Sequence, residues 1–274
     1  MKIRRTEYRP RPVVLTTHLS LPRPPNITEI SVRINPPSSG LAELDLSAAL
    51  SCSYLDSIII PKVERPQDID FVVNYINSSN HPLKHAIRVV ALLESARAVM
   101  DVGDIARKAQ EGRLDGLVFG AEDFGKDLGV GRTRGLSEFA YARQRIVLAA
   151  RAWGVQDVLD CVCTEVDDGG VLEEECVRGK AWGFTGKQVV HPGQVGVVQR
   201  VFGPEEGEVR DAVRVLVGDE RAGREGRGSW RLEGKMVDRP VVERAMEVVE
   251  RARGAGWGGR VKGWWREAEG EELK

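Results

Sequence analysis

The chain alternates short apolar runs with longer stretches in which apolar residues recur at helical spacing. Such a run predicts a buried strand, and the consecutive isoleucines of Ile58–Ile60 predict burial on both faces of a parallel sheet. The predicted strands are Ile27–Asn35, Ser57–Glu64, Arg88–Ser95, a run from Leu117 to Gly120, Gln156–Glu165 and Lys187–Pro192. The predicted helices are Leu41–Leu50, Gln67–Ser78, Ser95–Glu111, Ser137–Gly154 and Leu172–Trp182.

Regular alternation of strand and helix, with polar residues at the strands' carboxyl ends, is typical of a TIM-type (β/α)8 barrel whose active site lies at that face. The predicted strands are too few to close such a barrel. Val13–Leu19 is a candidate for another, but prolines flank it and no helix separates it from Ile27–Asn35, whereas a parallel crossover needs about a dozen residues or more. We therefore expect an α/β protein with a TIM-type barrel that lacks the usual first βα unit.

Beyond the last predicted strand, the sequence predicts a C-terminal helical arm. A helix covers Glu205–Gly223, a glycine-rich turn follows, and a loop that carries Asp238 precedes a second helix, Val241–Arg253. The tryptophans after Gly254 lie among glycines and charged residues, which indicates a loosely ordered tail. The expected organisation is an irregular segment at 1–25, a barrel domain at 26–203, C-terminal helices with a lid or arm at 204–253 and a flexible tail at 254–274.

Composition is that of an ordinary globular protein. With 274 residues and 42% hydrophobic content the chain can bury a sizeable core, and no apolar run approaches the length of a membrane span, so a soluble protein is expected. A formal net charge of -1 and a pI near 6.5 give no reason to expect nucleic acid or an anionic membrane as a partner. Anionic ligands must be met by local positive groups.

Cysteines and the amino-terminal segment bear on the cellular compartment. Cys52, Cys161, Cys163 and Cys176 lack paired C-x-x-C spacing, so buried free thiols are the expected state. Met1–Pro25 contains five arginines, one lysine and one acid, and it resembles a mitochondrial presequence only loosely because prolines interrupt any amphipathic helix. We expect an intracellular protein, in the mitochondrial matrix or alternatively in the cytoplasm.

Acidic residues follow two of the predicted strands. Glu94 ends one strand, and Glu122 and Asp123 come directly after another. The carboxyl ends of parallel strands share one edge of a sheet, so these acids can converge, and oxygen donors with open coordination positions suit Mg²⁺ or Mn²⁺. Glu122 points away from Asp123 if the segment stays extended, so it is left out of the metal site. The alternative is a pair of strand-end acids salt-bridged to Arg33 or Lys62.

Short motifs distributed from Ile27 to Arg253 resemble the HpcH/HpaI aldolase and citrate lyase family, specifically its citrate lyase beta-subunit-like members, which include citramalyl-CoA and malyl-CoA lyases. Each motif alone is weakly specific, whereas all of them in order and at sensible spacing are strongly specific. Family members open with a strand that ends in a Leu-Glu-Asp-like motif, and nothing in Met1–Pro25 matches it. The motifs are Ser31–Asn35, Ile60–Glu64, Leu92–Arg97, Phe119–Phe124, Gly186–Pro192 and Gly234–Pro240.

The resemblance implies a modified TIM barrel that uses Mg²⁺ and a CoA thioester and assembles as a homotrimer or a larger homo-oligomer. Carried over to this sequence, the metal ligands are Glu94 and Asp123, and the substrate-binding arginine is Arg33. Asp238 matches the acid that the family's C-terminal arm contributes to a neighbouring subunit's active site. Glu94 and Lys62 are expected to bind the substrate together with Arg33. Lys62 also ends a strand at this face, where we expect it to support a nearby carboxylate.

The implied reaction is Mg-dependent cleavage of a carbon–carbon bond in a 3-hydroxy-3-carboxyl acyl-CoA of the citramalyl-CoA, malyl-CoA or citryl-CoA type, which gives acetyl-CoA and a 2-oxo acid. In this reaction Arg33 stabilises a developing oxyanion and Asp238 acts as general base. Two alternatives stay open. One is a metal-dependent aldolase that acts on free 2-oxo acids; the other is a catalytically impaired or regulatory homologue with an incomplete barrel, whose open sheet edges invite aggregation.

Overall fold

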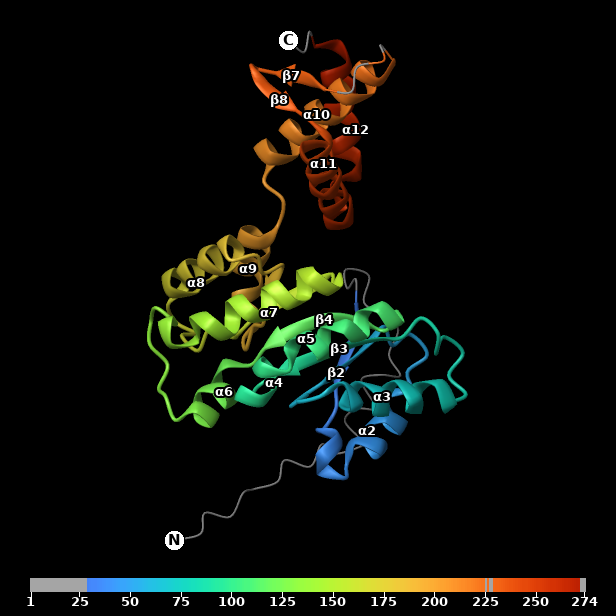
Figure 1. Cartoon of the computed structure of the whole chain (residues 1–274), viewed down its shortest axis with the longest axis vertical. Coiled ribbons are helices and arrows are strands. Elements are labelled where there is room, and N and C mark those ends of the chain that lie inside the picture. Colours follow the sequence, from blue (N-terminus) through green and yellow to red (C-terminus); the bar gives the residue numbers. More distant parts are fainter. Residues whose placement is uncertain (1–28, 225, 227–228, 272–274) are drawn as a thin grey trace. The chain divides into compact units, whose positions relative to one another are not determined.

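The computed structural model describes residues 29–271 except 225, 227 and 228 (Figure 1). The described chain forms two compact units that divide between Val195 and Gly196. The candidate strand Val13–Leu19 and the presequence-like segment Met1–Pro25 lie outside the described residues.

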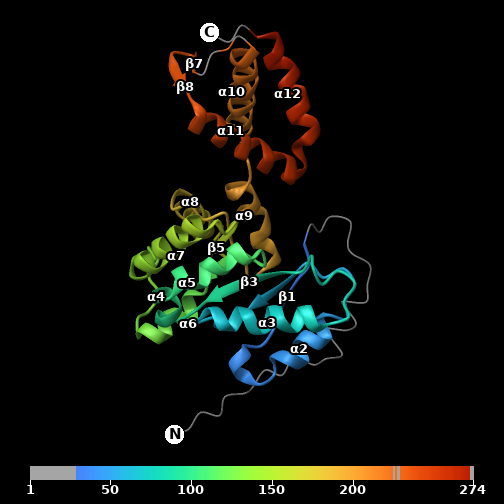
Figure 2. The same cartoon turned by 45° about the vertical axis from the view of Figure 1, so that its right-hand side comes forward.

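A parallel sheet forms the centre of the first unit, and its strands follow one another in chain order (Figure 2). Crossovers between parallel neighbours are right-handed as a rule, and in a sheet whose strands follow chain order they put the connecting helices on one face. Accordingly, helix α3 contacts β2 and β3, α7 contacts β4 and β5, and α8 contacts β6. The strands are β1 (Ser31–Arg33), β2 (Ser57–Ile60), β3 (Arg88–Leu93), β4 (Leu114–Phe119), β5 (Asp157–Asp160) and β6 (Gly186–Lys187).

Helices follow the strands closely, as the apolar periodicity predicts. The stretch expected as one helix from Ser95 to Glu111 is divided by a turn at Asp101. The α-helices of this unit are α2 (Ala42–Ala49), α3 (Pro66–Ser78), α4 (Ala96–Met100), α5 (Val102–Arg107), α6 (Ala121–Leu128), α7 (Ala140–Trp153) and α8 (Gly169–Ala181). The 3-10 helices are η1 (Pro37–Ser39), η2 (Lys108–Glu111), η3 (Ser137–Phe139) and η4 (Pro192–Gln194).

The α/β class is confirmed, but a closed eight-stranded barrel is not. The described residues hold six parallel strands, which form a curled half-barrel. The last two strands are also shorter than expected: β5 ends at Asp160, and β6 ends at Lys187 before η4 begins. Each of these strands ends at a buried charged residue, Asp160 or Lys187. Both residues are paired with charges from neighbouring elements.

Burial on both faces explains the continuous apolar runs. Leu117, Val118 and Phe119 are consecutive in β4 and are each at most 1% exposed, as the parallel sheet requires. The ring of Phe119 meets those of Phe124 on α6 and Phe139 edge to face, with centroids 5.3 and 5.8 Å apart. These ring contacts fix α6 at the end of β4.

A buried charge network lies where α7 and α8 cover β5 and β6. Arg143 of α7 makes a bidentate pair with Asp160 of β5, at 3.0 and 2.6 Å, and both side chains are fully buried. Lys187 lies 3.8 Å from the same carboxylate and 2.9 Å from Glu175 of α8. The Trp182 ring covers the guanidinium of Arg143 at 4.3 Å. Sequence patterns predicted an apolar core here and missed these charges.

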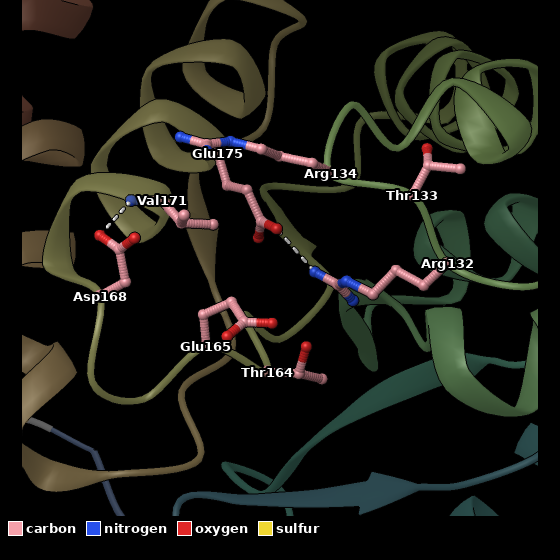
Figure 3. A pocket seen from close by; sticks show the side chains of 8 residues that line it. All are labelled: Arg132, Thr133, Arg134, Thr164, Glu165, Asp168, Val171 and Glu175. Atoms are coloured by element: carbon pink, nitrogen blue, oxygen red, sulfur yellow. Dashed lines mark hydrogen bonds and ion pairs between the residues drawn. The ribbon is translucent and has the colours of Figure 1, made fainter.

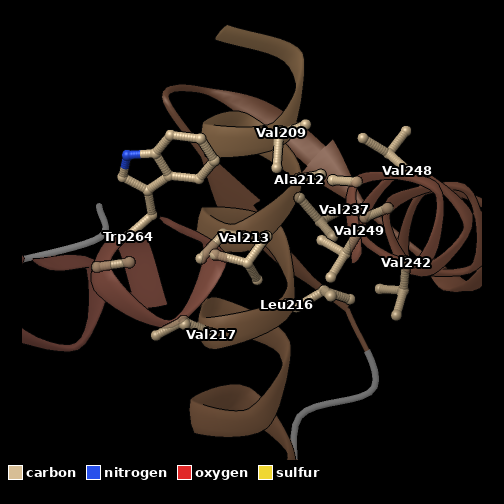
Figure 4. Close-up of a cluster of buried hydrophobic side chains, with 14 of the residues drawn as sticks. Val209, Ala212, Val213, Leu216, Val217, Val237, Val242, Val248, Val249 and Trp264 are labelled. Atoms are coloured by element: carbon tan, nitrogen blue, oxygen red, sulfur yellow. The ribbon is translucent and has the colours of Figure 1, made fainter. Parts of the chain in front are cut away.

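The second unit has its own hydrophobic core (Figure 4). Val209, Val213 and Leu216 of α10 pack in this core with Val249 of α11 and Trp264 of α12. The tail was expected to be loosely ordered, but Gly258–Gly270 forms a helix, and Trp264 on this helix is buried in the core. The elements are α9 (Val195–Phe202), α10 (Glu206–Arg224), β7 (Trp230–Leu232), β8 (Lys235–Val237), α11 (Arg239–Ala252), a π-helical turn (Arg253–Trp257) and α12 (Gly258–Gly270).

Among the described helices, none has the length and apolar character needed to cross a membrane.

Substitution of Asp160 by alanine should lower the free energy of unfolding by about 3–5 kcal/mol, because it leaves the buried Arg143 charge uncompensated. The matched control is Arg97→Ala, whose ion pair with Asp101 is 65% exposed on the arginine side and should be worth less than about 1 kcal/mol. Urea denaturation of the two variants measures the difference. Equal losses for both would show that the buried pair is not the stronger constraint.

Candidate metal and substrate site

Four charged residues come together at the carboxyl ends of neighbouring strands. Arg33 is the last residue of β1, Lys62 lies two residues beyond β2, and Glu94 directly follows β3. Asp123 lies in the first turn of α6, just after β4. These strands are adjacent and parallel, so their ends share one edge of the sheet. Four of the candidate site residues predicted from the sequence therefore lie at the same edge of the sheet in the first unit.

Lys62 contacts both candidate metal-ligating carboxylates. Its backbone N–H donates to Glu94 Oε2 at 3.1 Å, and its Nζ lies 3.3 Å from Asp123 Oδ2. Lys62 adopts a φ of 53°, in the left-handed region, which costs a non-glycine residue about 1–2 kcal/mol. Strained residues of this kind cluster at functional sites.

Gly120 makes room for the Glu94 side chain. A Cβ atom added at Gly120 would lie 2.5 Å from Glu94 Cγ and 3.0 Å from its Oε1, closer than real contacts allow. The backbone N–H of Gly120 donates to the Leu93 carbonyl at 2.9 Å, so the backbone cannot easily retreat. Sequence patterns did not predict that Glu94 needs a glycine at position 120. A glycine that stands between a buried strand and two acids could have indicated it.

Electrostatics at this edge disfavour a bare negative charge on Glu94. Burial raises the pKa of the Glu94 carboxyl above its usual value, and the neighbouring Asp123 carboxylate raises it further. Lys62 and Arg33 act in the opposite direction without cancelling the effect. A bound cation would offset both the desolvation and the repulsion.

The acidic segment after β4 is helical, which corrects the expectation of an extended chain. Glu122 and Asp123 lie in the first turn of α6, and Glu122 is taken up by an ion pair with Arg132 at 2.8 Å. Further along the same helix, Asp127 accepts a hydrogen bond from the Ala96 backbone N–H at 2.8 Å. That bond ties α6 to the start of α4, which directly follows Glu94 and its neighbour.

The residues present fit a hard divalent cation. Within the described part of the chain, no group of three or more His, Cys, Asp or Glu side chains is placed to hold a metal, so Glu94 and Asp123 would have to hold an ion as a pair. Mg²⁺ is commonly held by one or two carboxylates, with water and substrate oxygens completing the octahedron. A site of this kind needs open positions, which two carboxylates leave.

A cavity of about 310 Å³ opens at the ends of the next strands (Figure 3). Thr164 and Glu165, which follow β5, lie at one side of it, and Arg132 lies across from them. Arg132 joins this cavity to α6 through its contact with Glu122. The remaining lining residues are Thr133, Arg134, Asp168, Val171 and Glu175.

Asp238 lies in the second unit, directly after the hairpin of β7 and β8. It is exposed, and its carboxylate caps α11 by accepting from the Val241 backbone N–H at 3.4 Å. Pro240 at the second helical position favours the start of this helix. The long capping bond leaves the carboxylate accessible.

The four cysteines are free and buried, as expected. Burial raises the pKa of Cys161 to about 12 and that of Cys176 to about 11. Thiols with a raised pKa are poor nucleophiles, and these buried cysteines act as small apolar groups in the core.

Solved structures define the class of fold. A citrate lyase from Burkholderia xenovorans superposes with a TM-score of 0.71 over 89% of this chain and 79% of that chain, at 22% identity. The protein CitE from Mycobacterium tuberculosis, solved in complex with magnesium, acetoacetate and coenzyme A, superposes with a TM-score of 0.60 at 30% identity, over 81% of this chain and 78% of that one.

Sequence comparison then identifies the family. The model of HpcH/HpaI aldolase/citrate lyase matches residues 10–192, and the chain belongs to this family. Human mitochondrial citramalyl-CoA lyase is 33% identical over 231 residues, which cover 81% of this chain and 68% of that protein. The citrate lyase beta subunit of Haemophilus influenzae is 32% identical over 82% of this chain and 77% of that protein.

These findings confirm the family expected from the short motifs. They also confirm that the chain is an enzyme of the carbon–carbon lyase type, since the relatives are named lyases. The individual roles of Arg33, Lys62, Glu94, Asp123 and Asp238 stay predictions.

Replacing Glu94 by glutamine should stabilise the metal-free protein at pH 7.5. The raised pKa of Glu94 means that the folded state holds this proton more tightly than the unfolded state, whose value is near 4.5. Wild-type stability therefore falls as pH rises from 4.5 through the folded-state pKa, and the uncharged amide of the Glu94→Gln variant removes that loss. Urea denaturation in EDTA should show the stabilisation at pH 7.5 and little difference at pH 4. A variant that is less stable than wild type at pH 7.5 would contradict it.

Proposed function

We propose that this protein is a Mg²⁺-dependent lyase that cleaves a 3-hydroxy-3-carboxyl acyl-CoA to acetyl-CoA and a 2-oxo acid. Citramalyl-CoA is the first candidate substrate, because the human relative carries that name at 33% identity, and malyl-CoA and citryl-CoA are the others. The observation that carries the proposal is the placement of Arg33, Lys62, Glu94 and Asp123 at one edge of the sheet, with both carboxylates in contact with Lys62.

Glu94 and Asp123 are proposed to hold Mg²⁺, with Mn²⁺ as a substitute. When bound there, the ion would supply Lewis-acid polarisation of the substrate hydroxyl and carboxylate. The magnesium present with CitE from Mycobacterium tuberculosis supports this assignment, and one or two carboxylates are the usual protein ligands of Mg²⁺. Lys62 contacts both carboxylates, Glu94 through its backbone N–H and Asp123 through its Nζ.

Arg33 is proposed to bind the substrate and to stabilise negative charge. Cleavage leaves an enolate on the acetyl thioester, and a fixed guanidinium stabilises the developing oxyanion without reorganising. Arginine suits this role because it stays charged at every working pH and presents several donors in one plane. The Arg33 side chain is near enough to Glu94 to influence its pKa, and the residue is exposed.

Asp238 is proposed to act as general base on the substrate hydroxyl of a neighbouring subunit. It lies in the second unit, where it is exposed at the start of α11 and caps that helix through a long bond. This role requires a homo-oligomer, for which we propose a trimer or a larger assembly of trimers. The proposed location is the mitochondrial matrix, with the cytoplasm as the alternative, and the name of the human relative supports a mitochondrial location.

A catalytically impaired or regulatory homologue is the second candidate function. The open six-stranded sheet favours it, because the described residues leave the edges of β1 and β6 without a neighbouring strand. The two candidates are separated by activity: a folded, monodisperse protein that releases no acetyl-CoA from any of the three thioesters supports the impaired homologue.

Release of acetyl-CoA from citramalyl-CoA should require Mg²⁺ and Asp123. EDTA or Asp123→Asn should lower the rate by more than about 100-fold. Loss of a residue that only supports a metal ligand costs up to about 100-fold, and loss of the ligand itself should cost more. The matched control is Asp127→Asn on the same helix, which removes a charge but keeps a side-chain oxygen that can accept from the Ala96 N–H, so the rate should change little. Full activity of the Asp123 variant, or in EDTA, would refute the metal assignment.

Substitution of Asp238 by alanine should lower kcat by about 10²–10⁴-fold, the contribution typical of a general base. If the acid serves a neighbouring subunit, refolding Asp238→Ala together with the equally inactive Asp123→Ala should restore activity. In a ring of randomly mixed subunits, about a quarter of the sites would combine an intact Asp123 with an intact Asp238. A mixture as inactive as its two components would exclude a shared site.

A further inference from the structure

Arg132 lies at a junction between the candidate metal site and the buried charge network. It belongs to the loop that follows α6, and its side chain is 16% exposed. Its Nη1 donates to Glu122 at 2.8 Å, while its Nη2 donates to Glu175 at 2.8 Å and to the Val162 carbonyl at 2.9 Å. One guanidinium therefore joins the first turn of α6, the segment after β5 and helix α8.

The far side of this junction is buried. Glu175 is 3% exposed and also pairs with Lys187 at 2.9 Å, and Lys187 is close to the fully buried pair of Arg143 and Asp160. Figure 3 shows the Arg132 side chain reaching across the cavity to Glu175. A network of charges from β5, β6, α7 and α8 therefore holds Arg132 in place. Arg132 in turn holds the side chain of Glu122, on the side of the candidate metal site.

Glu122 is the residue directly before Asp123. The position of the Asp123 carboxylate depends on how the first turn of α6 is rotated about the helix axis. The other end of this short helix is fixed by the bond from Ala96 to Asp127, whereas at the first turn Arg132 anchors the side chain of Glu122. Partners of this kind, which orient a metal ligand without touching the metal, tune affinity strongly.

We propose that Arg132 is a positioning residue that orients the Asp123 carboxylate toward the metal by anchoring Glu122. This inference rests on the proposed function, because it takes Glu94 and Asp123 as the metal ligands. These contacts explain why an arginine suits this position. Its planar guanidinium donates to Glu122, to Glu175 and to the Val162 carbonyl, whereas a lysine ammonium on a flexible side chain does not reproduce this geometry.

Charge and geometry predict opposite effects of removing Arg132. A positive charge near a cation site weakens metal binding by repulsion, so its loss alone would strengthen binding. Loss of the anchor frees the first turn of α6 and weakens binding. The sign of the change in metal affinity of Arg132→Met therefore separates a positioning role from a purely electrostatic one, and a purely structural role would lower stability without changing affinity.

The test is a Mn²⁺ titration of the full-length protein without substrate, followed by electron paramagnetic resonance of the free ion. Arg132→Met and Arg132→Lys should both bind Mn²⁺ at least about tenfold more weakly than wild type, the range typical of lost outer-shell partners. The matched controls are Arg134→Met and Arg134→Lys, because Arg134 lies on the same loop, is 66% exposed and pairs with Glu174 on the outside of α8. These controls should bind as the wild type does.

Each result supports or overturns the inference. Wild-type or tighter Mn²⁺ binding by the Arg132 variants overturns it and leaves the proposed function standing. If the wild type binds no Mn²⁺, or binds it no better than Asp123→Asn does, the proposed function fails and the inference fails with it. Thermal unfolding verifies that each variant is folded, and if Arg132→Met does not fold, Arg132→Lys decides the question because it keeps a charge facing Glu175.

Discussion

Repulsion between two carboxylates held at one edge of a sheet is the constraint around which the first unit is arranged. Glu94 is partly buried beside Asp123, and its pKa is raised by burial and by that neighbour. The fold tolerates the arrangement by placing Lys62 against both acids, at the expense of a left-handed backbone conformation. The burial of Glu94, its closeness to Asp123 and the left-handed conformation of Lys62 each disfavour the metal-free folded state, and stability alone would not select them.

The surrounding structure holds the two carboxylates in place from several directions. Gly120 leaves space for the Glu94 side chain, and the aromatic contacts of Phe124 keep α6 at the end of its strand. Arg132 connects the first turn of that helix to charges that are fully buried between α7, α8 and the sheet. Stability and site geometry therefore depend on the same network, so substitutions far from the carboxylates can disturb both.

The residues that the family resemblance assigns to one active site come from both units of the chain. The candidate metal and substrate residues lie at one edge of the curled sheet, whereas Asp238 lies at the start of a helix in a unit with its own valine-rich core. The exposed position of Asp238 suits an acid that serves another subunit, and the stable core around α10, α11 and α12 gives that acid a defined support. Chemistry and assembly are linked in this proposal.

The sequence by itself determined the alternation of strands and helices, the parallel sheet, the family and the residues at the strand ends, because hydrophobic periodicity and motif spacing are local properties. Tertiary structure decided what local patterns do not contain: the helical conformation at Asp123, the space at Gly120, the charges around Asp160 and the burial of Trp264 in a tail rich in glycine. Each of these depends on a partner distant in the chain. Pairing of buried charges and close approach of backbones follow from packing, which a single stretch of sequence does not specify.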